Sequence, residues 1–188
     1  MAVLPIRIQG DPVLHSSAEP VTVFDAELRR LVADMYETMD AAPGVGLAGP
    51  QVGVNKRLFV FGWTDDDEVE YRGVAINPKL WITPAPIGEA DEEEEMEGCL
   101  SFPGERFPLK RAEEAILQAV DLDRKPFEIR ASGWLARIFQ HEYDHLDGII
   151  YIDRLPRPFD REWPKISRKR GWGVPDQQWI PGVDRLEG

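Results

Sequence analysis

The residues best suited to chemistry lie in one short run, His141-Glu142-Tyr143-Asp144-His145. Two histidines four residues apart on a helix lie on the same face, so both can bind one divalent ion. A glutamate beside the first histidine can then act as general base toward a water that the ion activates. The run therefore indicates a metal site able to support hydrolysis.

The helix that must carry this run is predicted from Gly133 to Asp147, with Ser132 before it and Gly148 after it. At about 100° per residue, one continuous arc of this helix is formed by Trp134, Leu135, Ile138, Phe139, His141, Glu142, His145 and Leu146. The opposite side is formed by Arg137, Gln140, Tyr143, Asp144 and Asp147. Both histidines and the glutamate are therefore expected to point into the core, where a bound cation is the simplest partner for all three.

A catalytic metal usually has three protein ligands and one open position, so a third ligand must be found. Tyr151 stands where one protease class has a third histidine, which excludes that class. Glu162 stands where another class has a glutamate, but it lies in a proline-rich stretch rather than on a second long helix. Cys99 is the single cysteine, and the glycine before it allows close backbone approach to an ion. A lone cysteine is also often a small buried hydrophobe, so the residues alone leave the third ligand open.

The elements that position these residues are predicted to be two helices around a mainly β middle region. A first helix is expected at residues 25–40, with Asp25 as its N-cap and Pro43-Gly44 after its end. Short strands are expected at 58–61, 74–76, 116–122 and 127–129.

Length and composition favour one soluble domain. We expect a single catalytic domain over residues 1–188, with an irregular tail rich in Pro and Trp from about residue 155, in which 162–169 could form a short helix. The chain starts without a signal-like leader and has no apolar stretch of membrane-spanning length, so a cytoplasmic location without membrane contact is expected. A single cysteine cannot form an internal disulfide, in agreement with a reducing compartment.

Charge is distributed unevenly along the chain. The formal net charge of −12 argues against general nucleic-acid binding, because that binding depends on Lys and Arg. Residues 89–97 hold seven carboxylates, whereas residues 154–170 hold seven Lys or Arg against two acids. We expect the acidic run to form a solvated loop and the basic segment to be ordinary surface.

Three motifs, in their usual order, resemble those of the peptide deformylase family. They are Gly44-Val45-Gly46-Leu47-Ala48-Gly49-Pro50-Gln51, Glu97-Gly98-Cys99-Leu100-Ser101 and His141-Glu142-Tyr143-Asp144-His145. Gly49 replaces the family's usual alanine but removes no functional group. Segments near the end, Gly171-Trp172-Gly173-Val174-Pro175 and Trp179-Ile180-Pro181-Gly182, are also similar to the actinobacterial branch.

The resemblance implies a fold and a metal centre. The fold would be α+β, with antiparallel strands around the metal-binding helix and with residues 44–51 and 97–101 flanking the metal. Cys99, His141 and His145 would bind one divalent ion, Fe(2+) in the cell and Zn(2+), Ni(2+) or Co(2+) in a purified sample. The enzyme would remove the N-formyl group from the N-terminal methionine of nascent polypeptides, with a transient ribosome contact among its partners.

The resemblance also implies roles at the substrate. Glu142 would act as general base and then general acid while a metal-activated water attacks the formyl carbon. The Gln51 side-chain amide and the Leu100 backbone N–H would stabilise the oxyanion. Gly46 would pair with the substrate backbone, and Arg106, expected in a turn beside the site, would meet the far end of the peptide. Arg106 could instead be an exposed arginine that balances the acidic run.

Several other readings are left for the structure to decide. The spacing Gly44-x-Gly46-x-x-Gly49 is a nominal dinucleotide fingerprint, although a helix rather than a strand is expected before it. The chain could also be another HExxH metallopeptidase, a metal-stabilised binding protein without catalysis, or a thiol hydrolase that uses Cys99 as nucleophile.

Overall fold

The computed structural model describes residues 2–184 and 186. Its α-helices are α1 (Ala26–Ala41), α2 (Gly133–Leu146) and α3 (Trp163–Arg170). Its short 3-10 segments are η1 (Pro12–His15), η2 (Gly49–Val52), η3 (Tyr151–Arg154) and η4 (Phe159–Arg161). Within the described residues, no helix combines the length and apolar character needed to cross a membrane.

The main sheet has five antiparallel strands in the order β2-β3-β4-β7-β8. Their bounds are β2 (Gly46–Ala48), β3 (Leu58–Thr64), β4 (Glu70–Ile82), β7 (Glu114–Val120) and β8 (Pro126–Ser132). A second antiparallel pair is formed by β5 (Met96–Cys99) and β6 (Phe102–Pro108). The third pair joins the two ends of the chain through β1 (Ile6–Arg7) and β9 (Gln178–Trp179).

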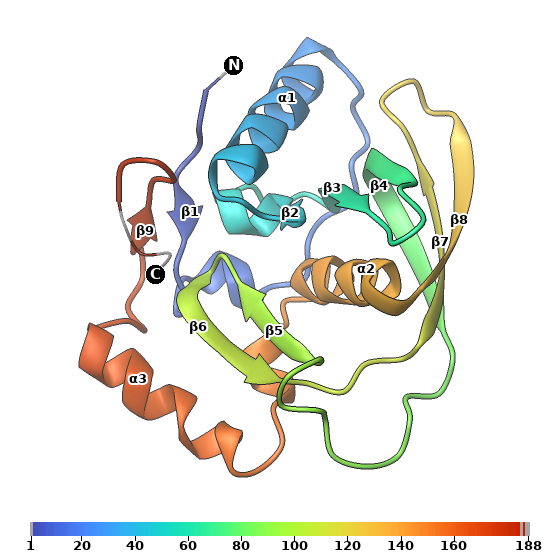
Figure 1. Cartoon of the computed structure of the whole chain (residues 1–188). Coiled ribbons are helices and arrows are strands. Elements are labelled where there is room, and N and C mark those ends of the chain that lie inside the picture. The colour runs from blue at the N-terminus through green and yellow to red at the C-terminus, as the bar shows by residue number, and fades with distance from the viewer. Residues whose placement is uncertain (1, 185, 187–188) are drawn as a thin grey trace.

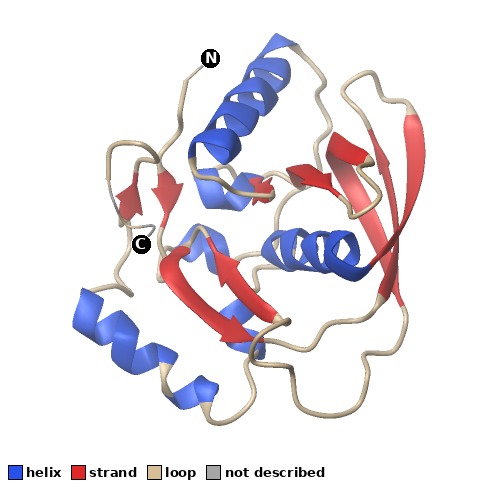
Figure 2. Cartoon of the chain, in the orientation of Figure 1, coloured by secondary structure: helices blue, strands red, loops and turns tan. Residues whose placement is uncertain are grey.

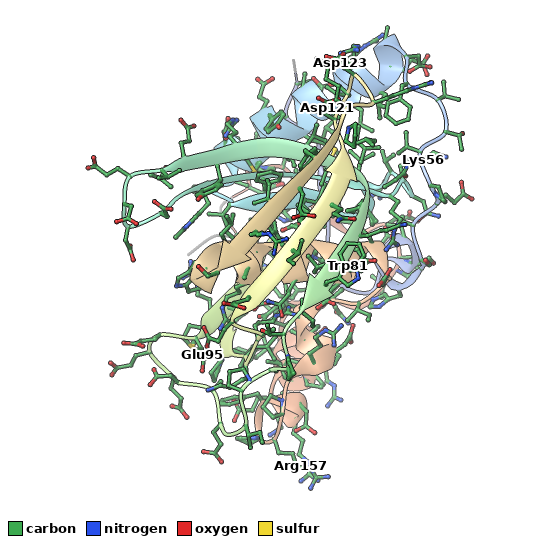
Figure 3. All side chains as sticks on the ribbon, turned by 90° about the vertical axis from the view of Figure 1, so that its right-hand side faces the viewer. Lys56, Trp81, Glu95, Asp121, Asp123 and Arg157 are labelled. Atoms are coloured by element: carbon green, nitrogen blue, oxygen red, sulfur yellow. The ribbon has the colours of Figure 1, made fainter. Side chains whose placement is uncertain are left out.

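Helix α2 lies between the main sheet and the β5–β6 pair, near the centre of the molecule (Figure 1). Strands are present on both sides of it (Figure 2), and in the turned view β4, β7 and β8 cross in front of it, with Trp81 on β4 (Figure 3). Phe139 of α2 packs edge-on against Phe61 of β3, with ring centroids 5.1 Å apart. This arrangement confirms the expected α+β fold with antiparallel strands around the histidine-bearing helix.

Helix α1 begins where its N-cap predicts. The Asp25 carboxylate accepts hydrogen bonds from the backbone N–H groups of Glu27 and Leu28, each at 3.0 Å. The strands are longer than predicted, since β4 continues through Ile82 with a bulge between Ile76 and Lys79. A bulge breaks the regular alternation of side chains, so the second half of β4 was not recognised from the sequence.

The side of α2 opposite its apolar arc is largely buried as well. Arg137, Gln140 and Asp144 lie on that side, and all three are buried. The segment that follows β6 covers them: Gln140 accepts a hydrogen bond from Ala112 N–H and donates to Ala112 C=O. Trp134, expected in the core, is 42% exposed. The helix is therefore enclosed on nearly all sides, and its polar side chains are buried as bonded pairs.

The C-terminal tail is more ordered than expected. It contains α3, close to the short helix anticipated at 162–169, and the strand β9. Trp179 of β9 is 1% exposed and pairs with Ile6 of β1. The tail therefore packs against the start of the chain rather than forming an irregular segment.

Candidate active site

Cys99, His141 and His145 come together as expected. One ligand atom from each lies within 4.8 Å of the others, and all three side chains are buried. Cys99 ends β5 and the histidines lie one turn apart on α2, so the hairpin and the helix together bring in the ligands. Cys99 Sγ is 3.2 Å from His145 Nε2. One thiolate with two imidazoles is a donor set suited to zinc or iron, so these residues fit a divalent transition metal.

The orientation of His141 supports the same interpretation. Its Nδ1 is 2.7 Å from Glu97 Oε1, which leaves Nε2 as the ring nitrogen available to an ion. Metal-binding histidines usually have a carboxylate or carbonyl on the nitrogen that does not bind the metal, because it fixes the ring and raises its basicity. Glu97 therefore has the position of such a carboxylate.

Glu97 is held by two buried arginines. Arg111 donates to both of its oxygens, at 2.6 and 3.1 Å, and Arg137 donates at 3.1 Å. Burial raises the pKa of Glu97, but the Arg111 guanidinium and His141 outweigh it, so the pKa lies well below its ordinary range. Glu97 is therefore ionised, and the expectation that the whole acidic run 89–97 is a solvated loop is wrong at this residue.

Arg111 connects this carboxylate to a second one on α2. Its Nη1 lies 2.6 Å from Asp144 Oδ2, and Arg154 Nε donates to the same oxygen at 2.6 Å. Burial lowers the pKa of Arg111, yet Glu97 and Asp144 together raise it above its ordinary value. The buried charges are thus compensated in pairs, as a buried network requires.

Sequence reasoning did not assign a role to Glu97, Arg111, Arg137 or Asp144. Glu97 could have been found from its place two residues before the cysteine, because a ligating histidine needs a carboxylate nearby. For the two arginines the sequence carries no comparable signal.

Glu142 lies beside the ligands and is buried. It is 3% exposed, and within the described residues its Oε2 has no hydrogen-bond partner. Burial raises the pKa of Glu142 to about 7, while His141 opposes that rise. A carboxyl group with such a pKa can accept and return a proton near neutral pH.

Gln51 points its amide nitrogen toward Cys99. The Ala48 backbone N–H donates to Gln51 Oε1 at 2.8 Å, so the amide orientation is fixed. Nε2 then lies 3.7 Å from Cys99 Sγ and 3.4 Å from Ser101 Oγ. The donor end of the amide is therefore available beside the metal ligands.

A pocket of about 760 Å³ opens onto these groups. Its lining includes the expected site residues Gly46, Gln51, Cys99, Leu100, Arg106, His141 and Glu142. Arg106 is exposed and lies on β6 opposite Gly98, so the predicted turn is wrong. Pro103 lies in the part of β6 that has no partner on β5, and Pro108 is the last residue of the strand.

The structure also bears on the alternatives. Within the described residues, the group of Cys, His, Asp or Glu side chains able to hold an ion contains Cys99 but not Glu162, which precedes α3. The dinucleotide fingerprint at 44–49 follows helix α1 and enters strand β2, so it lacks the strand-to-helix turn that holds a pyrophosphate.

An α+β fold with a cysteine from a hairpin, two histidines on a buried helix and a glutamate beside them defines a metal-dependent hydrolase. Residues 3–160 match the family model described as polypeptide deformylase. The chain belongs to the polypeptide deformylase family.

Individual relatives agree with this assignment over nearly the whole chain. The chain is 47% identical to a peptide deformylase of Tropheryma whipplei, covering 95% of this chain and 94% of the relative. It is 48% identical to that of Rhodococcus opacus, covering 97% and 95%. The crystal structure of a peptide deformylase from Thermus thermophilus superposes with a TM-score of 0.74 at 40% identity, covering 89% of this chain and 94% of that one. The expected resemblance to the actinobacterial branch is confirmed.

Proposed function

We propose that this chain removes the N-formyl group from the N-terminal methionine of nascent polypeptides in the cytoplasm, using one divalent ion held by Cys99, His141 and His145. The observation that carries the proposal is the convergence of these three ligand atoms within 4.8 Å, beside a buried glutamate and at the wall of a pocket. Fe(2+) is proposed as the ion in the cell, and Zn(2+), Ni(2+) or Co(2+) in a purified sample.

When bound, the ion supplies Lewis-acid chemistry, which polarises a carbonyl and lowers the pKa of a water. Glu142 would accept a proton of the attacking water through a carboxylate oxygen as the water oxygen bonds to the formyl carbon. Glu142 returns the proton to the amine nitrogen as the carbon–nitrogen bond breaks, so the products are formate and a free amino terminus.

The negative charge that develops on the formyl oxygen needs donors at fixed positions. Gln51 Nε2 is suited to this because the Ala48 N–H holds its other end. We propose the Leu100 backbone N–H as the second donor, since Leu100 follows Cys99 directly and lines the pocket. Neither group needs to reorganise during the reaction, which is the main advantage of such donors.

The remaining roles concern the substrate chain. Gly46 starts β2 at the edge of the main sheet, where an extended peptide could add as a further strand. Arg106 lies exposed at the pocket and could meet a main-chain carbonyl or terminal carboxylate of the peptide.

Instead of the ordinary surface expected for the basic segment 154–170, we propose that α3 makes a transient ribosome contact, since its exposed residues include Lys165, Arg168, Lys169 and Arg170. Cations of this kind bind phosphates in a salt-dependent manner. Co-sedimentation with ribosomes should weaken with salt and with charge reversal at Lys165 and Lys169; equal sedimentation of the reversed variant would contradict it.

Exchange of Glu142 for Gln tests the reaction. Glu142→Gln keeps the size of the side chain but cannot accept the proton, so the rate should fall by about 10²–10⁴-fold. Metal content should not change. Near-normal turnover of formyl-Met peptides by this variant would refute the mechanism, and loss of metal would show that Glu142 acts in ion binding instead.

A further inference from the structure

A tryptophan from the C-terminal strand reaches the segment that carries the cysteine ligand. Trp179 is 1% exposed, and its indole N–H donates to the Leu100 carbonyl at 2.8 Å. Trp179 lies beyond residues 3–160, the part of the chain that matches the family model. This contact is therefore contributed by a segment that lies outside the match to the family model.

The carbonyl that Trp179 contacts belongs to the peptide group joining Leu100 to Ser101. The N–H of the same peptide group donates to Cys99 Sγ at 3.4 Å. A donor on the carbonyl polarises the peptide and strengthens the hydrogen bond that its N–H donates, because chains of hydrogen bonds are cooperative. The indole of Trp179 is thus two hydrogen bonds away from the sulfur.

The same short segment is held from a second direction. Gln9 N–H donates to the Ser101 carbonyl at 2.8 Å, and Gly173 N–H donates to the Gln9 carbonyl at 3.1 Å. Strands β1 and β9, which carry Ile6 and Trp179, pair directly. The two chain ends therefore hold two successive peptide groups, Leu100–Ser101 and Ser101–Phe102, close after Cys99.

We infer that Trp179 is a positioning residue of the metal centre, acting on the Cys99 sulfur through the Leu100–Ser101 peptide group. The inference rests on the proposed role of Cys99 as a ligand. If the indole only filled space in the core, its N–H would be dispensable. If it acts through the peptide group, removing the N–H alone should alter the sulfur as an electron donor.

The test uses the full chain loaded with Co(2+), whose thiolate charge-transfer absorption reports on a cysteine ligand. In Trp179→Phe, and in a variant with β-(3-benzothienyl)alanine at 179 that keeps the indole shape without the N–H, the band should move to longer wavelength. This follows because a thiolate with a weaker hydrogen bond gives up an electron more easily. The kcat should fall about 10-fold, the lower limit for lost outer-shell partners, with KM nearly unchanged.

Trp172→Phe is the matched control. Trp172 also comes from the C-terminal segment and packs on Phe102, with ring centroids 5.0 Å apart, and no hydrogen bond from its indole is found within residues 2–184 and 186. The control should retain the band position and kcat of the parent protein. The benzothienylalanine variant decides the outcome if Trp179→Phe does not fold.

Two results would overturn the inference, and only the second would also overturn the proposed function. If both Trp179 variants keep the parent band and kcat, Trp179 serves only in packing, while the proposed function is unaffected. If the parent protein with Co(2+) shows no thiolate absorption, Cys99 is not a ligand, and the proposed metal centre fails together with the inference.

Discussion

Gly46 and Glu142 are in direct contact, since a Cβ built on Gly46 would lie 2.3 Å from Glu142 Oε1. No side chain other than hydrogen fits between strand β2 and the carboxylate. The glycine of the first motif is therefore needed for the position of the glutamate, in addition to its proposed pairing with the substrate.

Gly46→Ala should displace the Glu142 carboxylate while leaving the three metal ligands in place. We expect metal content to be unchanged and kcat to fall about 10²-fold, the size of effect that a displacement near 1 Å can cause. Gly62→Ala on the neighbouring strand is the control, because a Cβ there would meet only the far ends of the Arg72 and Met39 side chains within 3.4 Å. Equal losses in both variants, measured by steady-state kinetics and metal analysis, would contradict this explanation.

Glu97→Gln should weaken both the metal centre and the fold. The amide has nearly the same shape, but it removes the buried negative charge that Arg111 and Arg137 share, and leaves Arg111 only Asp144 and Arg137 only Glu95 as anionic partners. Breaking such a pair costs about 3–5 kcal/mol in unfolding free energy, and loss of the carboxylate at a ligating histidine costs about 10–100-fold in metal affinity.

Urea denaturation and competition with a chelator measure these two losses. Glu94→Gln, an exposed change in the same acidic run, should cause neither. If Glu97→Gln keeps both stability and metal affinity, the buried network does not support His141.

Arg106→Ala should affect the substrate rather than the reaction. If its guanidinium meets the far end of the peptide, KM should rise for short formyl-Met peptides with a free carboxylate, with kcat nearly unchanged and a smaller effect on amidated peptides. Arg130→Ala removes an exposed arginine that does not line the pocket and should leave both peptides unaffected. Equal changes for both peptide types, or none, would mean that Arg106 is ordinary surface.

The helices could be predicted because their signals are local. Asp25 as N-cap and the apolar spacing of α1 act within a few residues of each other, and the same holds for the histidine spacing on α2. The choice of Cys99 as the third metal ligand did not rest on a local signal. It rested on the resemblance of three motifs, because the spacing of residues alone left Glu162 as another possible ligand.

The residues that surround the site could not be predicted, because their contacts join positions far apart in the sequence. Arg111 meets Glu97 and Asp144 across 14 and 33 residues of sequence, and Trp179 meets Leu100 across 79. Such pairs form only after the hairpin, helix and tail have packed together. A single sequence does not show that the partners of the charged side chains on α2 are buried beside them.

The most direct test of the account is the dependence of deformylation on an ion bound through Cys99. Protein purified without oxygen should hold one divalent ion per chain, lose release of formate from formyl-Met peptides on chelation, and regain it with Fe(2+). Cys99→Ser should lower metal affinity and activity together, because the hydroxyl is a harder and less easily ionised ligand. Full activity in metal-free protein, or a Cys99→Ser variant that keeps both its ion and its rate, would contradict the account.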